Sequence, residues 1–502
     1  MKKITLCSLF TFFVGFLVAQ SVALDSTFGV NGQVTTHMYD SYGNPYGNNI
    51  VLESNGEVLI IGTVIDSNNW LPVLEKFGNN GVIDPSFIQN FPTLSEYNLG
   101  VSAQLDGKFL VTGEEPSSPF NGAVFRLNAD GMMDATFGND GFSSLLVRVF
   151  DNIIPMELST GKIVVFGDEN IPNADISVFA TRLHASGVVD NTFGEDGYFR
   201  FGLSDKYLLI SAGLEQPDGK LLFAGMAHWD LFMIRLHPDG TIDLSFGTDG
   251  YLIDPMPNGG EAYSLALQPD GKIVVCGYAD PSYQAIVARY HPNGSRDTTF
   301  GDQGVVYFTD IEEPTEGIGI EVLPSGKTLV GISNYYGKNF YIAQLLPSGA
   351  RDTAFGVNGV FEYINNDFRA RSMSLKANML AVSGREESSS GYHKMVLLRF
   401  LLDLNVGTIN PANPTDPTLW IYPNPIAEQF NLQFALTQKA PVSIQLFDVQ
   451  GKMVQTLVQN QSFESGEHIL NLNCPEQLPS GNYVLTLEVA GEKRTSVQVF
   501  KR

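Results

Sequence analysis

The chain has 502 residues, of which 43% are hydrophobic and 17% charged, with 50 glycines and a net charge of −24. A chain this apolar is not intrinsically disordered, because disordered chains are poor in apolar residues. The acidic balance excludes nucleic acid as a partner, since phosphate binding needs a basic surface. Many glycines and phenylalanines with few charges favour short strands joined by tight turns, so we expect an all-β fold.

The first residues have the pattern of a secretory signal peptide. Two lysines precede a short apolar run that ends in small residues, which predicts cleavage after Ala23 or Ala19. The alternative, a transmembrane anchor, is disfavoured because the run is short and no similar segment follows. Only Cys276 and Cys474 follow the signal, which excludes a disulfide framework. We expect residues 1–23 to be removed, and no transmembrane anchor.

The pattern Asp-x-Thr/Ser-Phe-Gly recurs along the chain, with weaker copies around two of its phenylalanines. These phenylalanines are Phe28, Phe87, Phe137, Phe193, Phe246, Phe300 and Phe355. Each unit also holds a hairpin motif of the type QPDGKIVVCG and a further strand of the type RLHPDG. Four short antiparallel strands in a repeat of roughly 50 residues predict a propeller blade. We therefore expect a seven-bladed β-propeller of four-stranded blades over residues 24–403.

The acidic loop Arg235–Gly250 raises the alternative of a calcium site. It lacks the alternating oxygen ligands and the final glutamate of an EF-hand loop. The slots of Asp239 and Asp249 hold Asn, Ser or Gln in other units, which is typical of residues that form turns. We therefore interpret the loop as a turn, and predict no metal and no cofactor.

The repeat aspartate itself stands eight residues after a polar, mostly basic residue. We predict arginine–carboxylate pairs that hold each strand end to the following turn. The predicted pairs are Arg126–Asp134, Arg182–Asp190, Arg235–Asp243 and Arg289–Asp297, with Lys76–Asp84 and Gln344–Asp352 as variants. Asp25 and Arg399 are left over, and they would meet if the repeats close into a ring. The alternative is that these charges lie at solvated strand ends, where ion pairs contribute little.

The motifs LDSTFGVNGQV and QPDGKIVVCG resemble the delta-60 repeat family. The resemblance covers about residues 24–403 and implies a β-propeller, without implying an activity. The last unit departs from the family pattern, because LKANMLAVSG lacks the turn glycine and LRFLLDLNVG lacks the Phe-Gly pair.

The C-terminal part of the chain has a different character. Residues 404–419 are rich in Pro and Asn and are predicted to be a linker. Residues 420–502 alternate in hydrophobicity over several short segments, which predicts a small Ig-like β-sandwich.

Three motifs within residues 420–502, namely YPNP, DVQGKMV and LPSGNY, resemble the type A sorting domain of the type IX (Por) secretion system. This resemblance implies the type IX secretion machinery as a partner and passage through the outer membrane. It also implies removal of the tail, with the rest of the chain released or attached to the cell surface. A sandwich of this kind could instead be an ordinary adhesion module, which is the alternative to the sorting domain.

No catalytic residues are predicted, and the question of enzymatic activity stays open with a binding role favoured. His184, His237 and His291 occupy one slot in consecutive units, which favours a strand-end role over a shared metal ion. The predicted ligand face consists of the variable loops opposite the uniform turns, because loops on a rigid scaffold carry function. Its candidates are Tyr39, Tyr42, Tyr46, Trp70, Trp229, Asp230, Tyr283, Tyr335, Tyr336 and Tyr392.

The predicted function is a secreted or cell-surface scaffold that binds a glycan or a protein, because flat amphipathic rings beside acids suit both surfaces. The alternative is an extracellular carbohydrate-active or other hydrolytic enzyme that uses the same face.

Overall fold

The computed structural model forms two compact units, Met1–Leu404 and Asn405–Arg502. It describes residues 22–39, 50–66, 69–87, 89–90, 100–115, 121–170, 176–204, 206–256, 259–280, 283–311, 314–334, 339–365, 368–386, 394–402, 419–422, 429–436, 438–448, 452–475, 478, 481–490 and 493–501. Every regular element within these ranges is a β-strand, so the predicted all-β class is confirmed. None of the described residues belongs to a helix long and apolar enough to cross a membrane.

Three sheets of the first unit have four strands in chain order. They are β14 (Leu208–Glu215), β15 (Leu221–Ala227), β16 (Asp230–Leu236) and β17 (Tyr251–Asp254); β18 (Gly260–Leu267), β19 (Ile273–Ala279), β20 (Gln284–Tyr290) and β21 (Val305–Tyr307); β22 (Thr315–Val322), β23 (Thr328–Asn334), β24 (Asn339–Leu345) and β25 (Val360–Ile364). In each sheet the second and third strands are almost entirely buried. Their β-branched and aromatic residues pack on both faces, as in the run Ile273–Ala279.

A seven-stranded sheet contains two further repeats, because the long strand β10 pairs with β9 through its first half and with β11 through its second half. Its strands are β7 (Gly100–Ala103), β8 (Phe109–Glu114), β9 (Asn121–Leu127), β10 (Phe142–Glu157), β11 (Ile163–Glu169), β12 (Ser177–Leu183) and β13 (Tyr198–Phe201).

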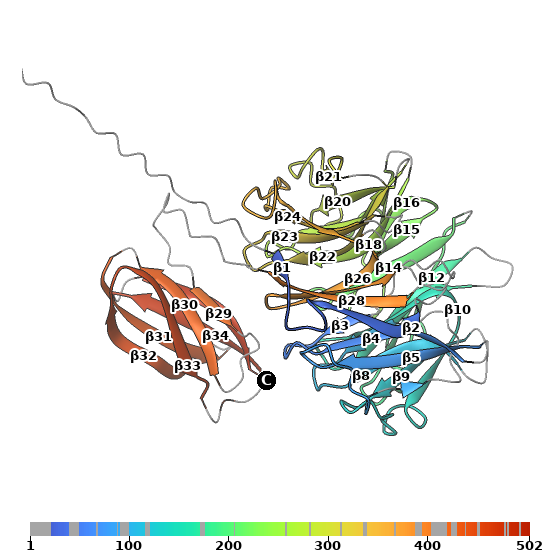
Figure 1. Cartoon of the computed structure of the whole chain (residues 1–502), viewed down its shortest axis with the longest axis horizontal. Helices are drawn as coiled ribbons and strands as arrows, with labels where there is room; N and C mark the ends of the chain where they lie inside the picture. The colour runs from blue at the N-terminus through green and yellow to red at the C-terminus, as the bar shows by residue number, and fades with distance from the viewer. Residues whose placement is uncertain are drawn as a thin grey trace, which may run out of the picture. The chain divides into compact units, whose positions relative to one another are not determined.

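A nine-stranded sheet joins the first and last repeats (Figure 1). Its strands are β1 (Val22–Leu24), β2 (Gln33–Tyr39), β3 (Ile50–Leu52), β4 (Val58–Asp66), β5 (Asn69–Phe77), β6 (Gln89–Asn90), β26 (Phe368–Lys376), β27 (Met379–Glu386) and β28 (Lys394–Leu402). Strand β2 pairs antiparallel with β28, with Val34 opposite Leu397, and β1 also pairs with β28. The strand that follows the first Asp-x-Thr-Phe-Gly motif thus completes the last repeat.

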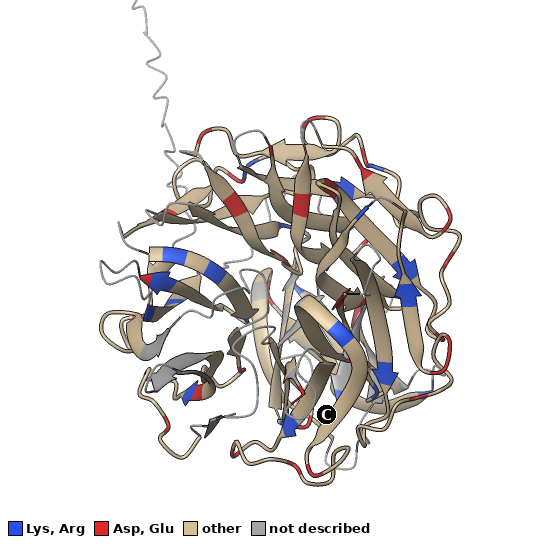
Figure 2. Ribbon diagram, turned by 90° about the vertical axis from the view of Figure 1, so that its right-hand side faces the viewer, with Lys and Arg blue, Asp and Glu red and all other residues tan. Residues whose placement is uncertain are grey.

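The core of the first unit is divided into clusters that lie between neighbouring sheets. One cluster joins Leu222 and Met233 to Val275 and Ile286 of the next sheet. Another joins Phe28 and Ile60 of the first repeat to Ala381 and Leu397 of the last repeat. Figure 2 shows many acidic residues on the loops between strands. Each sheet therefore buries its faces against its two neighbours.

The second unit has two sheets around one core. The three-stranded sheet contains β29 (Leu419–Tyr422), β30 (Gln429–Leu436) and β33 (Gly466–Asn473), and the four-stranded sheet contains β31 (Ala440–Asp448), β32 (Met453–Phe463), β34 (Gly481–Val489) and β35 (Lys493–Lys501). Phe430, Leu432 and Phe434 of the first sheet belong to the same buried cluster as Ile444 and Leu485 of the second sheet.

Candidate functional site

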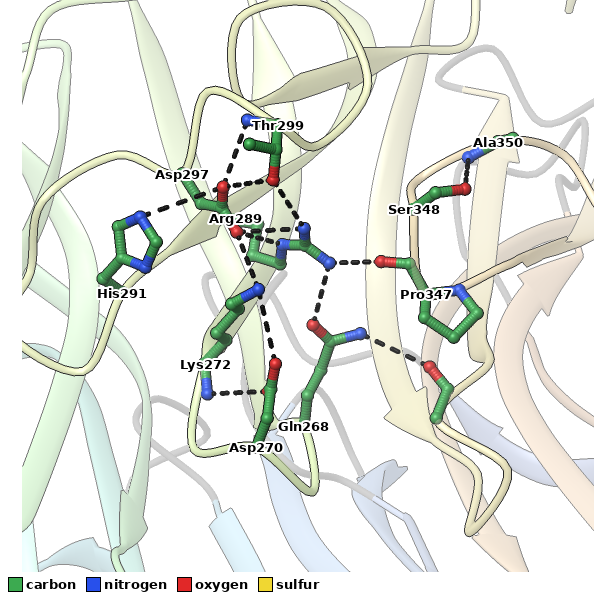
Figure 3. A network of polar contacts seen from close by, with 11 residues as sticks. Gln268, Asp270, Lys272, Arg289, His291, Asp297, Thr299, Pro347, Ser348 and Ala350 are labelled. Atoms are coloured by element: carbon green, nitrogen blue, oxygen red, sulfur yellow. Dashed lines mark hydrogen bonds and ion pairs between the residues drawn. The ribbon is translucent and has the colours of Figure 1, made fainter. Parts of the chain in front are cut away.

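Each strong copy of the repeat aspartate lies in a network of the kind shown around Asp297 in Figure 3. Arg289 donates from Nε to Oδ2 of Asp297 at 2.9 Å, and Lys272 Nζ lies 3.2 Å from the same oxygen. The backbone N–H and the hydroxyl of Thr299 donate to Oδ1 at 3.1 and 2.6 Å. Both oxygens of this buried carboxylate therefore have hydrogen-bond donors or a positive charge beside them, and this stabilises the buried negative charge.

The same arginine connects neighbouring sheets. Nη1 of Arg289 donates to the carbonyl of Pro347 in the next sheet, and its guanidinium lies 4.4 Å from the ring centroid of the repeat residue Phe300. The arrangement recurs in the pairs Arg126–Asp134, Arg182–Asp190 and Arg235–Asp243. These pairs contribute to the contacts between sheets, and none of them presents a carboxylate to solvent.

The leftover residues of the series also meet. Arg399 Nε donates to Asp25 Oδ2 at 2.9 Å, and Nη1 donates to the carbonyl of Gly56 at 2.6 Å. Nη2 donates to the carbonyl of Asn79, which occupies the place that Pro347 has for Arg289. The contact between the two ends of the repeat region thus uses the same groups as the contacts between consecutive repeats.

Two predicted variant pairs are wrong. Lys76 pairs with Glu57 at 2.8 Å and with Glu53 at 3.0 Å instead of with Asp84. In this repeat a glutamate, Glu57, occupies the position of the lysine in the Asp-Gly-Lys turn of the other repeats. Lys76 therefore has an acidic neighbour closer than the repeat aspartate.

The side-chain amide of Gln344 is fully buried and forms no hydrogen bond with the carboxylate of Asp352, whose Oδ2 lies 2.6 Å from Lys327 Nζ. The lysine of the Asp-Gly-Lys turn is therefore the second partner of the repeat aspartate, and sequence reasoning missed it.

The acidic loop is a turn. Asp239 Oδ1 accepts the N–H of Thr241 at 3.0 Å, and Asp249 has the left-handed φ of 55° that turn residues adopt. Within the described ranges, no three His, Cys, Asp or Glu residues gather in a way that could hold a metal ion. His291 lies 3.8 Å from its own Asp297, and the equivalent histidines lie equally close to the aspartates of their own repeats.

The buried aspartates predict a loss of stability in acid. Burial raises the pKa of Asp297, but the hydrogen bonds from Thr299 and Lys272 and the charge of Arg289 outweigh it and hold the pKa well below its usual value of 3.8. Because the folded pKa is depressed, the stabilisation is complete above pH 4 and is lost as pH falls below it. Urea unfolding from pH 6 to pH 2 should show this fall, and Asp297→Asn should make it shallower. Asp130→Asn, a change to the residue found in the same exposed slot at Asn293, should leave the pH profile unchanged.

A cavity of about 230 Å³ lies between four consecutive inner strands, β14, β18, β22 and β26. Each of these strands has a β-bulge, where one residue has no partner in the neighbouring strand. The unpaired residues are Ser211, Tyr263, Ile318 and Arg371, and all four line the cavity. Bulges often redirect side chains beside functional sites, so this cavity is the candidate site of the first unit.

The bulges also explain the glycine that ends motifs such as IVVCG. A Cβ on Gly277 would lie 1.8 Å from the carbonyl oxygen of Glu261, and one on Gly225 would lie 2.1 Å from that of Leu209. Only glycine allows the bulged strand to approach so closely. This recurrent glycine is the sequence signal that could have located the bulges.

Two of the predicted ligand-face residues are exposed aromatic residues that the structure describes in full. Trp229 is 50% exposed and Tyr283 is 39% exposed. His228 and Trp229 form the two-residue turn between β15 and β16 with φ of 49° and 75°, and Tyr283 has φ of 51°. Tyr207 packs edge-on against both turn residues, at 5.6 and 5.8 Å between ring centroids.

These loops lie next to the inner strands of the following sheets. The carbonyl of Trp229 accepts the N–H of Gly260 at the start of β18, and the carbonyl of Tyr283 accepts the N–H of Thr315 at the start of β22, both at 2.5 Å. A series of rings, Tyr263, Tyr278 and Tyr283, connects the cavity to the exposed loop at centroid distances of 5.6 and 4.8 Å. The loops and the cavity therefore belong to one region.

The remaining predicted ligand-face residues are half-buried or fall partly or wholly outside the described part of the structure. Asp230 begins β16 and is half-buried. Tyr39 and Trp70 lie in β2 and β5, and their side chains are outside the described part of the structure. The other candidates lie wholly outside the described residues, and they are Tyr42, Tyr46, Tyr335, Tyr336 and Tyr392.

Solved structures similar to this chain share little sequence with it. A polysaccharide lyase, Uly1, is 10% identical with a TM-score of 0.46, over 74% of this chain and 93% of that chain. The β-propeller domain of the Trilobed protease from Pyrococcus furiosus is 8% identical with a TM-score of 0.40, over 73% and 94%. A Trypanosoma rangeli sialidase is 9% identical with a TM-score of 0.34, over 93% and 88%. These similarities are too distant to bear on what this chain binds or does, and no curated protein matches it.

Family models match both units. Residues 104–137, 216–246 and 268–300 match the domain of unknown function (DUF5122) beta-propeller, and residues 420–501 match the secretion system C-terminal sorting domain. The sorting domain marks the chain for export by the type IX secretion system, either to the cell surface or as a secreted protein. The chain therefore carries three segments that match the DUF5122 β-propeller in its first unit and a type IX sorting domain in its second.

Proposed function

We propose that residues 24–403 form a closed ring of seven four-stranded blades, with β2 as the outer strand of the last blade. Support comes from the inner strands, each of which contacts the next, and from the contact of β26 with β3. The inner strands in this order are β3, β7, β10, β14, β18, β22 and β26. In this arrangement residues 1–23 are the signal peptide, 404–419 a linker and 420–502 an Ig-like sandwich that is removed after export.

This ring is a binding module that acts outside the cell or on its surface. One observation carries the proposal: an exposed tryptophan occupies a turn position that favours glycine. Two-residue hairpin turns with positive φ at both positions usually contain Asn-Gly, whereas this chain has His228 and Trp229. Such backbone conformations cost about 1–3 kcal/mol each and tend to occur at functional sites.

The ligand is a glycan or a protein surface. Trp229 and Tyr283 present flat amphipathic rings, and Asp230 directly follows Trp229 in the chain. Aromatic rings beside hydrogen-bonding groups recognise both sugars and protein surfaces. Export through the sorting domain brings this face into contact with extracellular material.

The test replaces Trp229 and Tyr283 with alanine together and measures binding to glycan and protein arrays. We expect loss of the signal that the unchanged protein gives, with an unchanged melting temperature, because both side chains are exposed. Leu244→Ala is the matched control, since Leu244 is 67% exposed but lies at the Asp-x-Ser-Phe-Gly turn. Unchanged binding by the double variant would contradict the proposed face, and turnover of a bound glycan would favour the enzyme alternative.

A further inference from the structure

The cavity between β14, β18, β22 and β26 contains a buried carboxylate that is only half satisfied. Glu316 is 2% exposed and lines the cavity. Its Oε1 accepts a hydrogen bond from Arg369 Nη2 at 2.9 Å, whereas its Oε2 has no hydrogen-bond partner among the described residues. Buried carboxylate oxygens are nearly always hydrogen-bonded, because leaving one without a donor is unfavourable. The cavity thus offers a strong acceptor to a molecule with a hydrogen-bond donor.

The charges around the cavity are balanced. Glu316 and Glu321 contribute two carboxylates, while Arg371 lines the cavity and Arg369 pairs with Glu316. The two carboxylates and the two guanidinium groups offset each other, so the cavity has no net charge that would attract an anion or a cation. The balance therefore favours a neutral ligand with many hydrogen-bonding groups.

The remaining lining combines a ring, small hydroxyls and apolar groups. Tyr263 provides the ring, and Ile318 and Met373 provide apolar surface. Three serines add hydroxyl groups that can donate or accept hydrogen bonds, and they are Ser211, Ser264 and Ser372. An aromatic face together with scattered polar groups matches a sugar ring, which has apolar C–H faces and an edge of hydroxyls.

The size of the cavity limits the ligand to a small molecule. Its volume of about 230 Å³ is below the roughly 300–1,000 Å³ of pockets that hold drug-sized ligands. Tyr263 also packs against Tyr278, which in turn stacks on Tyr283 of the exposed loop, so the cavity wall and the loop are in contact through these rings.

We propose that this cavity binds one neutral sugar ring of an extracellular glycan, with a sugar hydroxyl donating to Oε2 of Glu316. The inference rests on the proposed function, since it specifies the glycan ligand and adds an inner subsite to the predicted loop face. In this arrangement Arg369 is a positioning residue that holds Oε1 of Glu316, while Oε2 contacts the ligand.

The experiment titrates the exported protein with glucose, galactose, mannose and N-acetylglucosamine and follows binding by NMR. Glucuronate and glucosamine serve as anionic and cationic probes. We expect at least one neutral sugar to bind and the two charged probes to bind more weakly. Glu316→Gln should weaken binding by about tenfold to hundredfold, because it replaces a charged acceptor by a neutral one.

A second variant tests the cavity independently, in case Glu316→Gln fails to fold. Ala212→Leu places a larger side chain on the cavity wall without touching the ion pair, and it should abolish sugar binding. Glu157→Gln is the matched control, because this inner-strand glutamate is outside the cavity and accepts hydrogen bonds from Gln104 and from the N–H of Leu105. It should leave the affinity unchanged.

Two results would overturn the inference: failure of every neutral sugar to bind, or equal affinity in the unchanged protein and both cavity variants. Neither result decides the proposed function, which is tested by the loop variant with Trp229 and Tyr283 replaced. Loss of array binding in that variant, with no effect of Ala212→Leu, would leave the loop face as the binding site and exclude the cavity.

Discussion

Replacing Arg399 with alanine should lower the free energy of unfolding by about 3–5 kcal/mol, the effect of breaking a buried ion pair. Arg399 is 3% exposed and Asp25 is 4% exposed. The substitution leaves the carboxylate of Asp25 buried without the guanidinium that contacts its Oδ2 through Nε and Nη2, and it also removes the guanidinium from the ring of Phe28 at 4.4 Å. Chemical denaturation monitored by tryptophan fluorescence measures the change.

Two further arginine variants provide reference values for this loss of unfolding free energy. Arg289→Ala removes the same contacts between consecutive repeats, so it should be about as damaging as Arg399→Ala. Arg200→Ala breaks a pair with Glu169 at 2.8 Å in which the arginine side chain is 43% exposed and the glutamate side chain 10% exposed, so its effect should be smaller than that of Arg399→Ala. If Arg399→Ala were as mild as Arg200→Ala, the contact between the two ends of the repeat region would not be structural.

Deleting residues 420–502 should abolish export and leave the propeller folded. The second unit has its own buried core, so its removal takes no side chains from the core of the first unit. The deleted segment matches the sorting domain, and without this domain the type IX machinery has no signal to recognise on the chain. Cell fractionation followed by circular dichroism of the retained protein measures both outcomes.

The wild-type protein provides the complementary observation. Mass spectrometry of the exported protein should find no peptides from residues 420–502, because the tail is expected to be removed after passage. Normal export of the truncated chain would refute the sorting role. An intact tail on the extracellular protein would refute the cleavage alone.

The repeat framework could be predicted from the sequence because its motifs are dictated by local contacts. The Asp-x-Thr-Phe-Gly motif keeps its residues since each has one partner: the aspartate binds arginine, the threonine binds the aspartate, and the phenylalanine packs under the guanidinium. The eight-residue spacing was visible for the same reason. The matching lysine at Lys272 was missed because its partner Asp297 lies farther along the chain, in the turn between β20 and β21.

The cavity could not be predicted. Its walls come from inner strands whose sequences differ, and its lining depends on bulges that place Ser211, Tyr263 and Arg371 outside the regular pairing. The alternation of a strand predicts which face is buried, but a bulge changes that alternation locally. The half-satisfied state of Glu316 also depends on Arg369, which belongs to another repeat.

The two ends of the repeat region pair with each other through β2 and β28, and a disulfide cross-link between these strands tests this pairing most directly. Val34 and Leu397 are opposite each other in these strands, which is the separation that disulfides bridge. The variant Val34→Cys with Leu397→Cys should form the cross-link under mild oxidation, seen as faster migration in a non-reducing gel. Val34→Cys with Leu345→Cys, in a different sheet, should not. A folded Val34→Cys, Leu397→Cys protein that stays unlinked, or links only between molecules, would contradict the pairing.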